Sequence, residues 1–288
     1  MESIDISVGG FDIRLQSESF KNITLEGGYI PFINKSPVES YNVLIRSFAE
    51  IPEELFESEK IIFEARNEDQ LFFSIYQHDN DFKFVVYNQQ APGTIQQIAI
   101  LKNDLSEWLV YSANTDQPVY PLLYPLGPLV LYYLTVKYEA IMIHASGIFD
   151  GTKGRIFTGF SGAGKSTMAG LWQNNGNLIV NDDRLIIRKE MDGYFMYNTP
   201  MFYRDIPKRT PLHSINLIRH ATTNSMNKIG GVHAVSRVMA FCIQHSYNAV
   251  FLEHHLDFIS GLCNTINIYD VGFLPDKKIV DYILTHED

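Results

Sequence analysis

The sequence predicts an α/β domain built on a mixed sheet, preceded by a β-rich N-terminal domain. Three observations support this prediction. Short strand-like runs fill the first hundred or so residues, a glycine-rich loop near residue 160 lies between a strand and a helix, and helical and strand patterns alternate from there onward. Because 288 residues are many for one hydrophobic core, we place a boundary at residue 120 and expect domains over 1–120 and 121–288.

Composition favours a globular protein, with 45% hydrophobic and 19% charged residues. The net charge of −10 argues against a nucleic-acid partner, because phosphate backbones select basic surfaces. Two cysteines, Cys242 and Cys263, are too few for a disulfide framework and predict buried free thiols in a reducing compartment. Residues 1–5 lack the features of a secretion signal, and prolines interrupt the apolar stretch 120–138, so we expect a cytoplasmic protein with no membrane partner.

The N-terminal domain is predicted to be an antiparallel sheet. Turn signals such as residues 78–81 and 91–93 separate its apolar, β-branched runs. The expected strands cover residues 12–15, 60–64, 71–76, 82–87 and 95–100. No cluster of polar or charged side chains in this domain indicates chemistry, so its role stays open.

A buried helix that begins near Pro128 is predicted to lead into a strand over residues 140–149. The turn residues 150–154 then reverse the chain onto a second strand over 155–158. Together these segments predict a β-hairpin that ends at the glycine-rich loop.

The register of this hairpin determines which residue lies beside the loop. Residues whose numbers sum to 303 or 304 should face each other, which places His144 opposite Gly159 or Phe160. A lone histidine on a strand is more often structural than functional. The register is the reason to expect His144 at the mouth of the loop, where it can take part in proton transfer.

Residues 159–166 read G-F-S-G-A-G-K-S, the complete G-x-x-x-x-G-K-S pattern of a phosphate-binding loop. In this pattern backbone N–H groups surround phosphate oxygens, Lys165 reaches the β- and γ-phosphates, and the Ser166 hydroxyl holds Mg²⁺. The strand before the loop and the helix after it are the context that the pattern requires. We therefore expect a nucleoside triphosphate to bind. The expected contacts are Gly159, Ser161, Gly162, Ala163, Gly164, Lys165, Ser166 and Thr167.

The helix after the loop is predicted to bury one face, because Met168, Leu171 and Trp172 recur at helical spacing. The run Asn174–Gly176 ends it. Further strands are expected over 177–180, 186–187, 194–197 and 266–273, and further helices over 232–244, 256–263 and 276–285. This mixture predicts an α/β domain around the loop.

Two carboxylates, Asp182 and Asp183, follow the apolar strand 177–180. Phosphoryl transfer requires a metal to neutralise charge and a group that orients or deprotonates the attacking oxygen. Consecutive side chains on an extended backbone point to opposite sides, so one carboxylate can face Mg²⁺ and the other the acceptor. An Asp-Asp turn without function is the alternative for an isolated pair, and the position downstream of the loop favours function.

The segment from His144 to Asp183 resembles the catalytic core of bacterial HPr kinase/phosphorylases and of the wider phosphoenolpyruvate-carboxykinase-like superfamily. The resemblance covers about 40 residues and rests on the histidine strand, the loop, the helix and the Asp-Asp pair. It implies an HPr kinase-like, mixed-sheet P-loop nucleotide-binding domain. By the same resemblance Lys165 binds the transferred phosphate, Ser166 ligates Mg²⁺, Asp183 is the general base and His144 assists. Within the Asp-Asp pair we assign the metal to Asp182.

The sequence also departs from that family. HPr kinases carry a glutamate where this chain has Thr167, and neither their downstream metal-binding glutamate nor their HPr-binding signature is recognisable here. The resemblance therefore implies the phosphate chemistry and not the protein substrate.

The leading hypothesis is a Mg²⁺-dependent ATP phosphotransferase that acts on a hydroxyl of a small molecule, peptide or protein, with Asp183, His144 and Lys165 as catalytic residues. ATP is favoured because the guanine-recognition pattern N-K-x-D is absent. The alternative is a regulatory module that binds nucleotide without transferring phosphate. A carboxykinase-like decarboxylating enzyme ranks third, because its arginine and metal ligands are not assignable. Assembly into a homo-oligomer stays open.

Two further segments contain candidate residues. The proline-containing run Thr199–Arg204 lies where related proteins carry a loop over the site, and Arg204 is a candidate phosphate ligand whose alternative role is a solvated surface arginine. The run Glu253-His254-His255 suggests a metal site, but adjacent histidines on a helix point apart, which favours a structural role.

Overall fold

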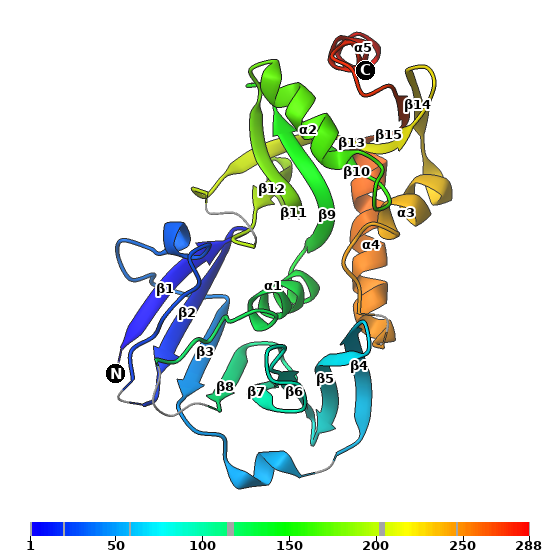
Figure 1. Ribbon diagram of the computed structural model, residues 1–288. Helices are drawn as coiled ribbons and strands as arrows, with labels where there is room; N and C mark the ends of the chain where they lie inside the picture. The colour runs from blue at the N-terminus through cyan, green and yellow to red at the C-terminus, as the bar shows by residue number, and fades with distance from the viewer. Residues whose placement is uncertain are drawn as a thin grey trace. The chain divides into compact units, whose positions relative to one another are not determined.

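A computed structural model describes residues 2–19, 21–57, 59–113, 118–201, 205–245 and 247–287. The chain divides into two compact units, residues 1–137 and 138–288 (Figure 1). Each unit contains one mixed sheet, of eight and seven strands. This is the α/β class that the sequence predicts.

The sheet of the first unit has the strand order β1-β2-β3-β8-β7-β6-β5-β4. Its strands are β1 (Ser3–Val8), β2 (Phe11–Ser17), β3 (Val43–Phe48), β4 (Ile61–Asn67), β5 (Gln70–His78), β6 (Asp81–Tyr87), β7 (Ile95–Leu101) and β8 (Glu107–Ser112). Two short 3₁₀ turns, η1 (Ile30–Phe32) and η2 (Glu53–Phe56), lie in the connections.

The prediction of an antiparallel N-terminal sheet was wrong, because the pairs β2–β3 and β3–β8 are parallel. The meander from β4 to β8 is antiparallel and consists of strands that local pattern predicts, apart from β8. Strand β3 enters between β2 and β8 after a long connection, and that pairing depends on contacts far apart in the sequence.

Helix α1 (Leu126–Lys137) belongs to the first unit and is buried around most of its circumference. Its Tyr133 ring packs edge-on against Phe84 of β6 and Trp108 of β8, with ring centroids 5.5 and 5.6 Å apart. The helix is therefore a core element, as its uniformly apolar sequence predicts. Among the described residues, no helix combines the length and the apolar character needed to cross a membrane.

The sheet of the second unit has the order β10-β9-β11-β12-β13-β15-β14, with an additional β10–β13 pairing. Its strands are β9 (Ala140–Phe149), β10 (Gly154–Thr158), β11 (Leu178–Glu190), β12 (Gly193–Asn198), β13 (Arg209–His220), β14 (Ser225–Ile229) and β15 (Asn267–Phe273). The pairs β10–β13 and β13–β15 are parallel, and the remaining pairs are antiparallel.

Helices cover both faces of this sheet (Figure 1). They are α2 (Lys165–Asn174), α3 (Gly231–Met239), α4 (Ala249–Thr265) and α5 (Lys278–His286). One core contains side chains of α2 and α5, including the fully buried Met168 and Trp172 that the sequence predicts. The other contains side chains of α3 and α4. Helix α3 ends earlier than predicted, and Asn248 caps α4 by accepting hydrogen bonds from the N–H groups of Val250 and Phe251.

One strand prediction in this unit was wrong, and two strands, β13 and β14, were not predicted. Strand β11 does not end at the Asp-Asp pair, because a bulge near residue 180 lets it pair along β9 as far as Arg188. Asp182 and Asp183 therefore lie within a strand. Strand β13 was not predicted, because polar residues and Pro211 dominate its first part and the polar Asn216 interrupts the apolar residues of 215–218.

A buried ion-pair network in the second unit connects the β9–β10 hairpin with the residue that follows α5. Arg155 is 1% exposed, and its guanidinium contacts the Asp150 carboxylate at 2.6 Å and the Glu287 carboxylate at 2.7 Å. The Ser214 hydroxyl donates to Glu287 Oε1 at 2.6 Å. Burial raises the pKa of Asp150, but hydrogen bonds from Lys153 N–H, Arg155 and Thr152 outweigh it and hold that pKa well below its ordinary value.

The turn between β9 and β10 is the one predicted from residues 150–154. Asp150 Oδ1 accepts hydrogen bonds from the N–H groups of Thr152 and Lys153 and from the Thr152 hydroxyl. This local Asx-type arrangement closes the hairpin at a short polar segment. Both cysteines of the unit, Cys242 and Cys263, are free and buried, as predicted.

Candidate functional site

The glycine-rich loop lies between the end of β10 and the start of α2, the strand-loop-helix context predicted from the sequence. Gly164 has φ +95°, and a Cβ atom there would lie 2.7 Å from Phe273 Cζ. At Gly159 a Cβ would lie 2.6 Å from the carbonyl oxygen of Ile218 on β13. The loop therefore packs so tightly against β13 and β15 that side chains at these two positions would displace it.

Lys165 is the first residue of α2, and its ammonium group folds back over the loop. It donates to the carbonyl oxygens of Gly159 at 3.1 Å and Phe160 at 3.4 Å. No side chain of the described residues caps the N-terminus of α2. The first-turn N–H groups and the Lys165 ammonium thus present positive charge at one place, which suits an anion.

The predicted hairpin register is confirmed. Phe157 pairs with Ser146 and Thr158 with Ala145, so paired numbers sum to 303. The Thr158 hydroxyl donates to the backbone oxygen of His144 at 2.8 Å, which holds the histidine backbone beside the strand that enters the loop. His144 is therefore placed where the sequence analysis expects it.

Pairing of β11 with β9 brings the carboxylates to the same place. Asp182 pairs with Ser146, Asp183 with Ala145, and Arg184 with His144. The Ser146 hydroxyl donates to Asp182 Oδ1.

Asp183 lies between two basic side chains. Its Oδ1 is 3.8 Å from His144 Nε2, and its Oδ2 is 3.7 Å from Arg184 Nε. Burial raises the pKa of Asp183 above its ordinary value, the neighbouring Asp182 adds to the increase, and Arg184, His144 and Lys165 oppose it. Oδ2 is buried and has no hydrogen-bond partner among the described residues. The carboxylate can therefore accept a proton or a hydrogen bond.

Lys165 and His144 respond to the same charges. Burial lowers the pKa of Lys165, and Asp182 and Asp183 partly counteract it. Burial also lowers the pKa of His144, with a further decrease from Lys165, so the imidazole is neutral near pH 7. These couplings mean that the loop lysine, the histidine and both carboxylates share one electrostatic environment.

A divalent cation fits the oxygen donors present. Mg²⁺ usually keeps several waters and takes one or two carboxylates together with substrate phosphates. Asp182 supplies a carboxylate, and Ser166 on the first turn of α2 supplies a hydroxyl. Asp183 Oδ2 is 3.7 Å from Arg184 Nε and accepts no hydrogen bond from the described residues. Within the described part of the chain, no three His, Cys, Asp or Glu side chains form a metal-binding group.

The sequence analysis missed His220, the last residue of β13. Its Nε2 donates to the carbonyl oxygen of Gly162 at 3.1 Å, and its ring stacks on Phe273 with centroids 5.3 Å apart. The ring also lies directly against Gly164, because a Cβ there would come within 3.2 Å of His220 Cε1. His220 thus supports the middle of the loop. No sequence pattern near His220 indicates this contact, and the sequence analysis did not predict the strand that ends there.

The remaining candidates lie away from this cluster or outside the described residues. Arg204 falls outside the described residues, so its prediction stays as it was. On α4, His254 is exposed, whereas His255 is buried with its ring nitrogen 3.1 Å from Gln244 Oε1. The two histidines point apart as expected, and with Glu253 exposed they form no metal-binding group.

Comparison with known proteins gives structural similarity without sequence similarity. No family model matches the sequence, and no curated protein matches it. Among solved structures, the chain is similar to the HPr(Ser) kinase/phosphatase from Coxiella burnetii, with 13% sequence identity and a TM-score of 0.30. The match covers 51% of this chain and 99% of that chain. At this level of similarity, a functional proposal has to rest on the residues of the site.

Proposed function

We propose that this chain is a Mg²⁺-dependent kinase that transfers the γ-phosphate of ATP to a hydroxyl group of a small molecule, peptide or protein. One observation supports the proposal most strongly. Strands β9, β10 and β11 pair side by side, so His144 and Asp183 lie near the loop that carries Lys165. In the sequence, Asp183 comes 39 residues after His144. A phosphate cradle, a cation and a base are the parts that phosphoryl transfer requires.

The loop is proposed to hold the triphosphate. Backbone N–H groups at the start of α2 donate to phosphate oxygens, and the Lys165 ammonium leaves the carbonyl oxygens of Gly159 and Phe160 to pair with the β- and γ-phosphates. Ser166 and Asp182 would hold Mg²⁺. When bound there, the ion would neutralise charge on the phosphate oxygens.

Asp183 is proposed to act as the general base. As the acceptor oxygen attacks the γ-phosphorus, its proton passes to the Asp183 carboxylate, and the bond between the γ-phosphorus and the bridging oxygen breaks to release ADP. A raised pKa suits this role, because it increases the basicity of the carboxylate. Neutral His144, 3.8 Å away, is placed to orient the carboxylate.

Replacing Lys165 by alanine tests the proposed binding. Loss of a charged hydrogen-bond donor costs about 1.5–3 kcal/mol, so we expect Mg-ATP affinity to fall by roughly 10- to 150-fold. Isothermal titration calorimetry measures the affinity, and Lys278→Ala, at an exposed lysine of α5, is the matched control. Equal affinity of Lys165→Ala and the unmodified chain would contradict the proposal.

The donor and acceptor are tested with ATP labelled at the γ-phosphate and incubated with fractions of host lysate. The kinase proposal expects label on a hydroxyl-bearing component. The alternative, a regulatory module that binds nucleotide without transfer, expects Mg-ATP binding with the label retained on ATP.

His220 is expected to matter for nucleotide affinity through the shape of the loop. His220→Phe keeps a ring against Phe273 but removes the donor to Gly162, and we expect roughly 2- to 10-fold weaker Mg-ATP binding, the equivalent of one neutral hydrogen bond. His220→Gln keeps an N–H donor and should bind more tightly than His220→Phe. The exposed His254→Phe serves as control in the same calorimetric titration. If His220→Phe binds as the unmodified chain does, the hydrogen bond has no role in the loop.

A further inference from the structure

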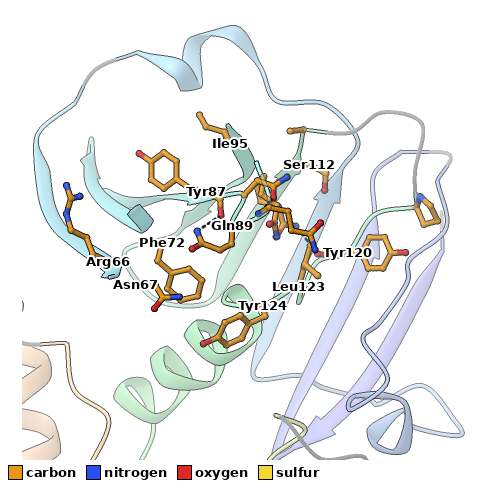
Figure 2. Close-up of a pocket in the computed structure, with 16 residues that line it drawn as sticks. Arg66, Asn67, Phe72, Tyr87, Gln89, Ile95, Ser112, Tyr120, Leu123 and Tyr124 are labelled. Atoms are coloured by element: carbon orange, nitrogen blue, oxygen red, sulfur yellow. Dashed lines mark hydrogen bonds between the residues drawn. The ribbon is translucent and has the colours of Figure 1, made fainter. Parts of the chain in front are cut away.

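We propose that the first unit contains a binding pocket for an uncharged saccharide. A cavity of about 1030 Å³ opens at the ends of β4 to β8 and beside the segment that precedes α1 (Figure 2). Its lining residues all belong to the first unit. The proposal concerns a site separate from the loop of the second unit and does not depend on the kinase proposal.

The polar part of the lining consists mainly of amides. Six amide side chains contribute, those of Asn67, Asn88, Gln89, Gln90, Gln96 and Gln97, and no carboxylate is found among the described lining residues. Arg66 is the one charged residue of the described lining, and its guanidinium lies 3.3 Å from a Glu64 carboxylate oxygen. The described part of the lining is therefore dominated by neutral polar groups. Among these described residues, none offers a cationic ligand a negative counter-ion, and the guanidinium of Arg66, which could attract an anion, is paired with Glu64.

Aromatic rings form the apolar part of the lining. Phe72 and Tyr124 pack together with ring centroids 5.4 Å apart and planes tilted by 40°, and both border the cavity (Figure 2). Tyr87 and Tyr120 contribute further rings. Aromatic faces carry partial negative charge, so they attract the C–H groups of a ring that has hydroxyls at its edges.

One buried acceptor in the lining lacks a partner. Gln97 is 2% exposed, and its Nε2 donates to the carbonyl oxygen of Tyr120 at 2.8 Å, while its Oε1 has no hydrogen bond among the described residues. Gln89, by contrast, is held by bonds from its Nε2 to the carbonyl oxygens of Leu71 and Tyr87. A hydroxyl donor that reached Gln97 Oε1 would satisfy this acceptor, which favours a ligand rich in O–H groups.

A neutral sugar has both the hydroxyl groups and the apolar ring face that would complement the amides and aromatic rings of this lining. Each hydroxyl both donates and accepts, as does each amide, whereas a carboxylate only accepts and an ammonium only donates. The apolar ring face matches the aromatic wall. The cavity volume lies at the upper end of the range of small-molecule pockets, which suits more than one sugar unit.

Nuclear magnetic resonance titration of the full-length, isotope-labelled chain tests the proposal, with maltose, cellobiose and chitobiose as neutral probes. Glucosamine and glucuronate are the charged comparisons. We expect a neutral disaccharide to shift resonances of Gln97 and the surrounding amides, and the charged sugars to bind at least tenfold more weakly. The proposal is overturned if none of the three disaccharides shifts these resonances, or if a charged sugar binds as tightly.

A pair of variants separates pocket binding from weak surface association. Tyr124 is 40% exposed and Phe56 is 55% exposed, so replacing either ring by alanine leaves the core intact. Phe56 does not line this cavity. We expect Tyr124→Ala to weaken disaccharide binding roughly tenfold and Phe56→Ala to leave it unchanged. Equal effects of the two substitutions would overturn the assignment of the site.

Discussion

Replacement of Asp183 by asparagine is expected to reduce phosphoryl transfer by roughly 10²- to 10⁴-fold, the usual contribution of a general base. The amide has nearly the same shape as the carboxylate but cannot accept the proton of the attacking hydroxyl. Mg-ATP binding should persist, because the loop, Lys165 and Ser166 are unchanged. This separation of binding from transfer distinguishes a base from a phosphate ligand.

The measurement compares label transfer from ATP and calorimetric affinity in the same preparation. Asp192→Asn is the matched control, since Asp192 lies exposed in the turn between β11 and β12 and belongs to the same hairpin. Asp192→Asn should transfer phosphate normally. Undiminished transfer by Asp183→Asn would remove the proposed base, and loss of Mg-ATP binding would reassign the residue to nucleotide or metal binding.

Replacement of Glu287 by alanine is expected to lower the free energy of unfolding by about 3–5 kcal/mol. The Glu287 side chain is 1% exposed and pairs with the equally buried guanidinium of Arg155, which also lies over the Trp172 ring at 5.0 Å. Removing the carboxylate leaves Arg155 with Asp150 alone and leaves the Ser214 hydroxyl without its acceptor. A substitution that leaves a buried charge without enough opposite charge around it is among the most destabilising single changes.

Urea unfolding followed by circular dichroism measures this loss. Glu253→Ala, at an exposed position of α4, is the control and should stay within about 0.5 kcal/mol of the unmodified chain. A combined Arg155→Met and Glu287→Leu replacement should be less destabilising than Glu287→Ala, because it removes both charges together. A Glu287→Ala variant as stable as the control would show that water or a rearranged side chain compensates Arg155.

The features predicted correctly in the second unit are local ones. The loop 159–166, the polar turn at Asp150 and the buried face of α2 each depend on residues within about ten positions of one another. The hairpin register also follows from a short turn, because the turn sets which residues of β9 and β10 pair. His144 could be placed beside the loop for that reason.

The features that were missed depend on pairing between distant strands. Strand β11 was expected to end at the Asp-Asp pair, but pairing with β9 continues it, and the pairing partner is not visible in the local pattern. The hydrogen bond from Ser146 to Asp182 and the proximity of Arg184 to Asp183 follow from the same pairing. The parallel strands of the first unit and the position of His220 have the same origin.

For this protein, residue order alone is enough to specify the glycine-rich loop, its flanking strand and helix, and the chemical character of the acids and histidine around it. Those properties arise from backbone conformations and side-chain types that neighbours in the chain dictate. The proximity of His144 to Asp183 and the contact of His220 with Gly162 of the loop arise instead from the pairing of β11 and β13 with the hairpin. Long-range strand pairing is selected by the burial of whole sheet faces, which no short stretch of sequence encodes.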